Sequence, residues 1–402
     1  MQKEDRSTLS RWFIGTAVVG FAAVSVIASA PGAFARSAIG RLPSHPTPMT
    51  VTLPHPSLQI PAIGTAATGS NLKVWHSTVT SGGTSYPYYM VGKNVKVAQS
   101  IPTTTVTTPV IPLIIKIGTS TWDPTVAQSA CGETASVVSR VQQSPLFDKT
   151  HDFVFGGKHM GTTQYTDAYQ RGNFYKFTKP TGVNPGYHVL LKYVAHPAIT
   201  ITVPPADAGI GGGGCESEGA VEINWFDTYL QTTVFPALAA EGTPIGPNKF
   251  PVFVMRNVTF FFGTVGNCCA LGYHNAFNNA SFGGNAQTYT AFEWPDNSYF
   301  PTTFNDTVVA SHEVAEWMDD PFTNNPTPSW GNIGQVSGCQ NNLENGDPLT
   351  PTNVPPVTVN GFTYHLQELA FFSWFFRQTP SWGVNGWYSD NGTFTSPSAP
   401  CP

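Results

Sequence analysis

The chain has 402 residues, of which 11% are charged, against about 25% in an average soluble domain. So few charged residues exclude a coiled coil, and 41% hydrophobic with 13% aromatic residues exclude a charged disordered chain. The formal net charge is −5 and the sequence contains no lysine or arginine run, so we expect no nucleic-acid partner.

The N-terminal residues 1–35 have the order of a secretory signal. Basic residues within 1–11 precede an uncharged stretch at 12–30, which is followed by Ala33-Phe34-Ala35 as a peptidase site. An uncleaved anchor is the alternative, because the stretch approaches the roughly 20 residues that span a bilayer. We therefore expect a secreted protein, extracellular or in the periplasm or cell envelope, that meets a membrane only through this segment.

Six cysteines fit three disulfides in an exported chain, and the sequence does not choose among their connectivities. We expect the adjacent pair to bond to two separate partners, because a bridge between neighbours strains the peptide between them. The six are Cys131, Cys215, Cys268, Cys269, Cys339 and Cys401.

Composition divides the rest of the chain into four parts. Residues 36–70 are rich in Pro, Ser and Thr and indicate a linker or pro-segment, and 71–208 contain short strand-like runs. The glycine-rich segment 209–214 formally matches GxGxxG, but Pro204-Pro205 breaks the strand that a dinucleotide site needs. We interpret it as a flexible hinge before a second domain at 215–402.

The second domain shows a clearer order of elements. Helical spacing of apolar residues predicts a packing helix within 220–238, and residues 250–262 predict one or two strands. Residues 287–294 predict an edge strand. The segment 307–319 predicts a helix that Pro321 stops.

This last helix carries the strongest chemical signal. His312 and Glu316 lie one turn apart on the same face, so they can hold one metal ion between them. Glu313 lies about 100° around the helix, where it can reach a water on the metal without ligating. Asp319 and Asp320 offer further oxygen ligands, and five ionisable residues within nine positions stand out in a charge-poor chain.

The sequence at 308–316, VVASHEVAE, followed by Asp320-Pro321, resembles the SHELAE…TDP active-site helix of secreted bacterial zincin-like metallopeptidases. The segment 269–277, CALGYHNAF, is similar to their C-x-x-GYH-x-AF segment. The pattern is more distantly similar to plant phosphate-induced, Exordium-like secreted proteins, which lack the His-Glu pair. The resemblance implies an α+β zincin-like catalytic domain beside a β-rich N-terminal region with long loops. Such a domain has a mixed twisted sheet with an edge strand, a backing helix and an active-site helix.

The resemblance also implies a zinc-dependent peptidase. His312, Glu316 and Asp320 would be the metal ligands, and Glu313 the general base for water attacking the carbonyl of a protein or peptide substrate. Calcium is a second possibility for the metal, although a histidine ligand argues against it. His274 is an alternative third ligand.

Two further questions stay open at this level. A group that polarises the substrate carbonyl could be His274, Tyr364, His365 or Tyr388. The family places a GEI-x-D-x-C segment after the helix, whereas residues 331–335 lack both acids before Cys339. The alternative function is therefore a catalytically inactive zincin-like protein that binds cell-surface glycans or peptides. The oligomeric state is not indicated.

Overall fold

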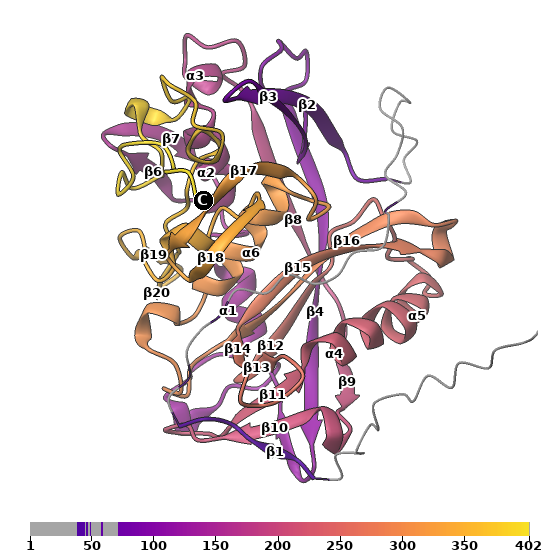
Figure 1. Ribbon diagram of the computed structural model, residues 1–402. Helices are drawn as coiled ribbons and strands as arrows, with labels where there is room; N and C mark the ends of the chain where they lie inside the picture. The colour runs from indigo at the N-terminus through magenta and orange to yellow at the C-terminus, as the bar shows by residue number, and fades with distance from the viewer. Residues whose placement is uncertain (1–37, 45, 47–48, 50–57, 59–70, 402) are drawn as a thin grey trace, which may run out of the picture. The chain divides into compact units, whose positions relative to one another are not determined.

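The computed structural model describes residues 38–44, 46, 49, 58 and 71–401 (Figure 1). The expected signal at 1–35 and most of the expected linker at 36–70 lie outside the described residues. Within the described ranges, no helix has the length and apolar character needed to cross a membrane.

The fold is mixed α+β and rich in strands, and its main sheet positions the site. Strands β16, β12 and β4 run parallel to one another, and β15 pairs antiparallel with β16 at the edge. The sheet order is β15 (Gly272–Asn279), β16 (Asn285–Trp294), β12 (Val252–Arg256), β4 (Thr103–Ile117) and β5 (Ser120–Trp122), with β8 (His188–Ala195) and β9 (Ile199–Thr202) also paired to β4.

Strands form at both predicted segments, 250–262 and 287–294, but the second has a different place in the sheet from the one predicted. Strands β12 and β13 (Val258–Phe261) occupy the predicted region 250–262. The prediction that 287–294 is an edge strand was wrong, since β16 lies between β15 and β12. The sequence could not show this because β15 and β16 are both buried and read alike.

A second sheet contains the glycine-rich segment. Gly209 and Ile210 pair with β1 and β11, so the first part of the expected hinge 209–214 is a strand. Residues on both sides of this segment share the main sheet, because β4 pairs with β12. The order in the second sheet is β1 (Gly40–Arg41), β10 (Ala208–Gly211), β11 (Glu218–Glu222), β13 and β14 (Cys268–Ala270).

The remaining elements are hairpins and short helices. The hairpins are β2 (Val74–Ser81) with β3 (Thr84–Val91), β6 (Asp152–Phe155) with β7 (Lys158–Thr162), β17 (Pro326–Ile333) with β18 (Val336–Asn342), and β19 (Val357–Val359) with β20 (Phe362–Tyr364). The helices are α1 (Val137–Gln143), α2 (Tyr165–Asn173), α3 (Tyr175–Thr178), α4 (Ile223–Tyr229), a π turn (Leu230–Val234), α5 (Phe235–Ala239), α6 (Val308–Asp319) and α7 (Phe372–Phe375). Short 3-10 turns occur at Ser129–Cys131, Pro205–Asp207, Ala280–Phe282, Thr302–Phe304, Asp347–Leu349 and Val384–Gly386.

The main sheet lies between α6 on one face and α4 with α5 on the other (Figure 1). Alternate residues of β12 point to opposite faces: Val252 and Val254 pack in the core that holds α6, and Phe253 in the core that holds α4 and α5. The predicted packing helix at 220–238 and the predicted helix at 307–319 are both confirmed.

Helix α6 is buried along its whole length, including its polar residues. Trp317 stacks on Phe250 with ring centroids 3.6 Å apart, and its indole nitrogen donates to Thr288 Oγ1 at 3.0 Å. The helix ends at Asp319, because Pro321 disfavours helical geometry at the residue before it. Trp317 thus anchors α6 to the main sheet.

Three disulfides are present, as expected, but the pairing of the adjacent cysteines corrects the prediction. Cys268 and Cys269 are bonded to each other across a cis peptide bond, rather than to separate partners. The other four cysteines pair among themselves, as Cys131–Cys215 and Cys339–Cys401, so no separate partners remain.

Candidate metal centre

Helix α6 brings His312 and Glu316 together as the one-turn spacing predicts. His312 Nε2 lies 3.0 Å from Glu316 Oε1. His312 is 7% exposed, Glu316 is 3% exposed, and Glu313 beside them is 6% exposed. The polar edge of α6 is therefore nearly closed to solvent, where charges interact strongly.

His274, on the edge strand β15, faces the same carboxylates. Its Nδ1 atom lies 3.4 Å from Glu313 Oε2 and 3.5 Å from Glu316 Oε2. The close approach of β15 to α6 depends on Gly272, because a Cβ there would crowd Val309 and Glu313. Of the open candidates from the sequence, His274 is the one that the fold brings to the helix.

Two acids that sequence reasoning missed complete the group. Asp347 Oδ1 lies 3.6 Å from His312 Nε2, and Gln335 and Gln340 donate their side-chain amides to the Asp347 carboxylate. Glu344 lies with His274 and Glu316 in a group whose possible ligand atoms are all within 4.8 Å of one another. The available signal was two acids within four residues of a charge-poor chain.

We call these six residues the carboxylate–histidine cluster: His274, His312, Glu313, Glu316, Glu344 and Asp347. They come from β15, from α6 and from the segment that follows β18. Segments more than 70 residues apart in the sequence thus meet at one point.

The ring of His312 is oriented by Gln367. His312 Nδ1 lies 3.0 Å from Gln367 Oε1 and donates to it, so the ring is turned with Nε2 towards Glu316 and Asp347. Gln367 is itself fixed, since its amide donates to Gly346 O and to Thr350 Oγ1. A histidine held in this way is typical of a metal ligand.

Burial and neighbouring charges shift the protonation of the cluster. Burial lowers the pKa of His312, but Glu316 outweighs it and raises that pKa well above the ordinary value. For Glu316 burial raises the pKa, yet His312 and His274 bring it below its usual range. Burial raises the pKa of Asp347 to about 7. A bound cation would replace the protons on the histidines, so metal binding should release protons.

Asp320 and Asp319 serve other contacts. The Asp320 carboxylate accepts hydrogen bonds from two backbone amides, those of Asn324 at 3.0 Å and Asn325 at 2.9 Å. Asp319 accepts from side chains of α2 and from Asn345, which ties α2 to α6. The assignment of Asp320 as third ligand stays a prediction, and its two oxygens are already engaged by the turn after α6.

The other candidates from the sequence lie in different contacts. The Tyr388 hydroxyl donates to Gln378 O at 2.9 Å and that of Tyr364 to Arg140 O at 2.9 Å. The His365 ring contacts Asp306 at 2.6 Å. None of these three hydrogen bonds involves a residue of the carboxylate–histidine cluster.

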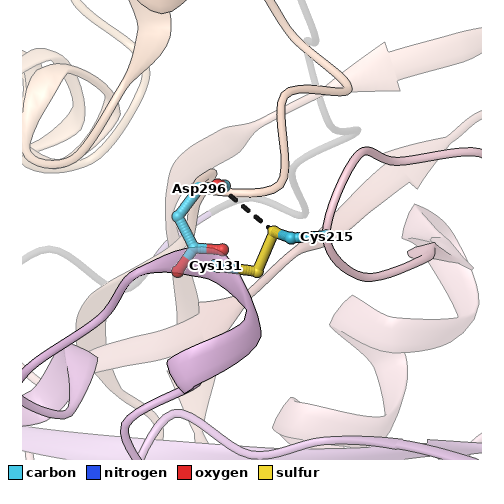
Figure 2. A group of neighbouring side chains, drawn as sticks. All are labelled: Cys131, Cys215 and Asp296. Atoms are coloured by element: carbon cyan, nitrogen blue, oxygen red, sulfur yellow. Dashed lines mark hydrogen bonds between the residues drawn. A yellow bond between two sulfur atoms is a disulfide. The ribbon is translucent and has the colours of Figure 1, made fainter.

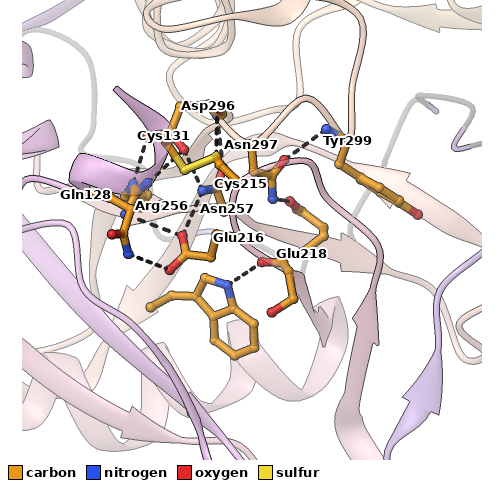
Figure 3. Close-up of a disulfide and its surroundings, with 12 residues drawn as sticks. Gln128, Cys131, Cys215, Glu216, Glu218, Arg256, Asn257, Asp296, Asn297 and Tyr299 are labelled. Carbon is orange, nitrogen blue, oxygen red and sulfur yellow. Dashed lines mark hydrogen bonds and ion pairs between the residues drawn. A yellow bond between two sulfur atoms is a disulfide. The ribbon is translucent and has the colours of Figure 1, made fainter. Parts of the chain in front are cut away.

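Another group of possible ligands consists of Cys131, Cys215 and Asp296. Figure 2 shows Asp296 beside the Cys131–Cys215 disulfide, with Cys215 Sγ 3.8 Å from the Asp296 carbonyl oxygen. Both sulfurs are in the disulfide bond, so they are not thiolate ligands. Figure 3 shows what holds this region: Arg256 pairs with Asp296 at 2.8 Å and with Glu216 at 3.3 Å. The group is a structural network.

No family model, no curated protein and no solved structure matches this chain.

Proposed function

We propose that this chain is a metal-dependent hydrolase, a zincin-like peptidase whose ligands are His312, Glu316 and Asp347. The observation that carries the proposal is the pair of distances from His312 Nε2 to two carboxylate oxygens. His312 Nε2 lies 3.0 Å from Glu316 Oε1 and 3.6 Å from Asp347 Oδ1. In a tetrahedral zinc site with bonds of about 2.0–2.2 Å, neighbouring ligand atoms are about 3.3–3.6 Å apart.

The donor set fits zinc better than calcium. One imidazole with two carboxylates is compatible with a catalytic zinc site, which leaves a position for water. Calcium prefers six or more oxygen ligands, and the His312 nitrogen is a poor substitute. A bound zinc ion would supply a Lewis acid that lowers the pKa of its water towards about 7.

The chain's own residues supply the remaining parts. Gln367 and the Gly346 amide hold His312 and Glu316, since the amide donates to Glu316 Oε1 at 3.0 Å. Glu313, whose pKa burial raises, is suited to take a proton from the attacking water and pass it to the leaving amine. Strand β15 pairs with β16 alone in the described sheet, so an extended peptide could align along its outer edge.

The test compares the signal-free wild type with two variants of α6. Elemental analysis should find at least one zinc per chain in the wild type and in Glu313→Gln, and a loss in His312→Ala. Cleavage of casein should disappear in both variants. His159→Ala, at an exposed histidine on β7, is the matched control and should keep metal and activity. A metal-free, inactive wild type would overturn the proposal.

Burial favours one alternative, a secreted binding protein in which the metal has a structural role. His312, Glu316 and Asp347 are 7%, 3% and 3% exposed, which leaves little access for a polypeptide. A role in glycan stacking finds less support, because the most exposed large apolar side chains of the described residues are Val and Ile, without aromatics. Zinc bound without hydrolysis of any peptide, together with a lower Tm after chelation, would favour this alternative.

A further inference from the structure

The two oxygens of the Glu316 carboxylate face two different histidines. Oε1 lies 3.0 Å from Nε2 of His312 on the same helix, and Oε2 lies 3.5 Å from Nδ1 of His274 on strand β15. A carboxylate that presents one oxygen to each of two ligand sets has the arrangement of a bridge between two metal ions. The ions of such hydrolytic sites lie about 3.5–4 Å apart.

A second group of possible ligands lies on the His274 side of this carboxylate. The possible ligand atoms of His274, Glu316 and Glu344 all lie within 4.8 Å of one another. Glu344 is half-buried and is held by Asn342, whose side-chain amide donates to Glu344 Oε1 at 2.6 Å. This set shares only Glu316 with the set formed by His312 and Asp347.

An independent observation concerns His274 itself. Its residue is 7% exposed, yet its Nε2 atom has no hydrogen-bond partner, while its Nδ1 atom faces Glu313 at 3.4 Å and Glu316 at 3.5 Å. A buried imidazole is costly unless its nitrogens are satisfied. A cation held through the ring would satisfy one of them.

The charge of the cluster points in the same direction. It contains three buried carboxylates and the half-buried Glu344, and their ion pairs among the described residues involve histidine alone, without lysine or arginine. Buried carboxylates need compensating charge. With both histidines as neutral ligands and all four carboxylates ionised, two dications would balance the charge of the cluster.

We infer that the cluster binds two divalent metal ions bridged by Glu316, the first held by His312 and Asp347 and the second by His274 and Glu344. The inference rests on the proposed function, because it adds a second ion to the same site. Glu313, 3.4 Å from His274 Nδ1, stands beside the second ion as the proton acceptor. Zinc, cobalt(II) and manganese(II) are the ions that this mixed nitrogen and oxygen set suits.

The experiment is a metal titration of the apo protein with cobalt(II), followed by elemental analysis after dialysis. The wild type should bind two equivalents, and His274→Ala and Glu344→Gln should each bind one. Glu316→Gln removes the proposed bridge between the two cobalt(II) ions. The signal of exchange coupling between them should therefore disappear from the electron paramagnetic resonance spectrum. His159→Ala is the control and should keep both ions. Circular dichroism reports folding of each variant, and the half-buried Glu344 provides a test if His274→Ala does not fold.

The outcomes separate the two proposals. One equivalent in the wild type, with no coupled signal, overturns the second site and leaves the proposed hydrolase standing, with His274 as a positioning residue. Two equivalents that are both retained in His274→Ala and Glu344→Gln place the second ion elsewhere and also overturn the inference. No metal in the wild type overturns both.

Discussion

The ring of His312 is held by Gln367, whose Oε1 lies 3.0 Å from His312 Nδ1 although the two residues are 55 positions apart. The same glutamine donates to the Gly346 carbonyl, in the loop that carries Glu344 and Asp347. One buried side chain therefore positions both the helix and the loop parts of the cluster. This relationship makes Gln367 a positioning residue with a measurable effect.

Replacing Gln367 with Met should weaken metal binding while the fold persists. The variant keeps the side-chain volume but leaves His312 Nδ1 and the Gly346 carbonyl without their partners. Loss of such an orienting contact typically costs about 10- to 100-fold in metal affinity. Competition with a chromophoric chelator measures the change. An unchanged zinc Kd would show that Gln367 does not orient the ligand.

Gly346→Ala should displace the His312 ring. A Cβ at this position would collide with the imidazole, whose atoms are the three nearest to it. Because the ring cannot move without leaving Glu316 and Asp347, we expect metal affinity to fall by at least about 10-fold. Gly242→Ala is the matched control, since nothing lies within 4 Å of its Cβ. Equal affinities of the two variants would contradict the prediction.

The Cys339–Cys401 disulfide should matter to the metal as well as to stability. It closes 62 residues of chain, and its loss should cost about 4 kcal/mol on the chain-entropy model. It also anchors β18, whose Gln340 donates to Asp347 at 3.2 Å. The double variant Cys339→Ser, Cys401→Ser should therefore lower both the Tm and the zinc affinity.

The control for that prediction is the double variant Cys131→Ser, Cys215→Ser. This disulfide closes a loop of 84 residues and contacts no residue of the carboxylate–histidine cluster in the hydrogen bonds described above. The control variant should lower the Tm by a similar amount, and zinc affinity should stay at the wild-type value. Calorimetry and chelator competition on both double variants make the comparison. A fall in affinity in both would indicate a general loss of folding rather than a local effect on Asp347.

A second buried acid pair, Glu218 and Glu293, predicts the pH dependence of stability. Burial raises the pKa of Glu218 to about 8, and burial beside Glu218 raises the pKa of Glu293 well above its usual value. The native state therefore keeps protons that the unfolded chain releases above about pH 4.5. Stability should fall as the pH rises from about 4.5 to 8, because the folded state binds more protons in this window.

Glu218→Gln should remove the part of this dependence that Glu218 contributes. The amide is neutral at every pH and can still accept from Asn297, which donates to Glu218 Oε2 at 2.8 Å. At pH 5 we expect a Tm close to that of the wild type, and at pH 8 a gain on the order of 2 kcal/mol in the free energy of unfolding. Thermal melts of the apo proteins at both pH values provide the measurement. A wild type that becomes more stable from pH 5 to 8 would contradict the shift.

Local patterns in the sequence were sufficient for the elements around the site. Helical spacing predicted α6 and the helices α4 and α5, and the i and i+4 positions of His312 and Glu316 placed them together. Each of these features depends on residues within one or two turns, where helix geometry fixes side-chain directions. The cysteine count similarly indicated three disulfides.

Long-range pairing was beyond such patterns. Whether β15 or β16 lies at the sheet edge depends on hydrogen bonds between strands, and two buried strands look the same in sequence. The pairing of Cys268 with Cys269 depended on where the other four cysteines lie. The sequence predicted a hinge at the glycine-rich segment. Its pairing with β1 and β11 depends on tertiary structure, which local patterns do not show.

The amino-acid sequence alone determined that a histidine and a glutamate share one face of a helix in a charge-poor protein. The tertiary structure decided which other groups reach that face: His274 from an edge strand, and Glu344 and Asp347 from a loop. It also placed Asp320 in a turn, where backbone amides use its oxygens. The reason is physical: a helix fixes neighbours at one-turn spacing by its own geometry, whereas groups on separate segments meet only where the sheet and loops pack.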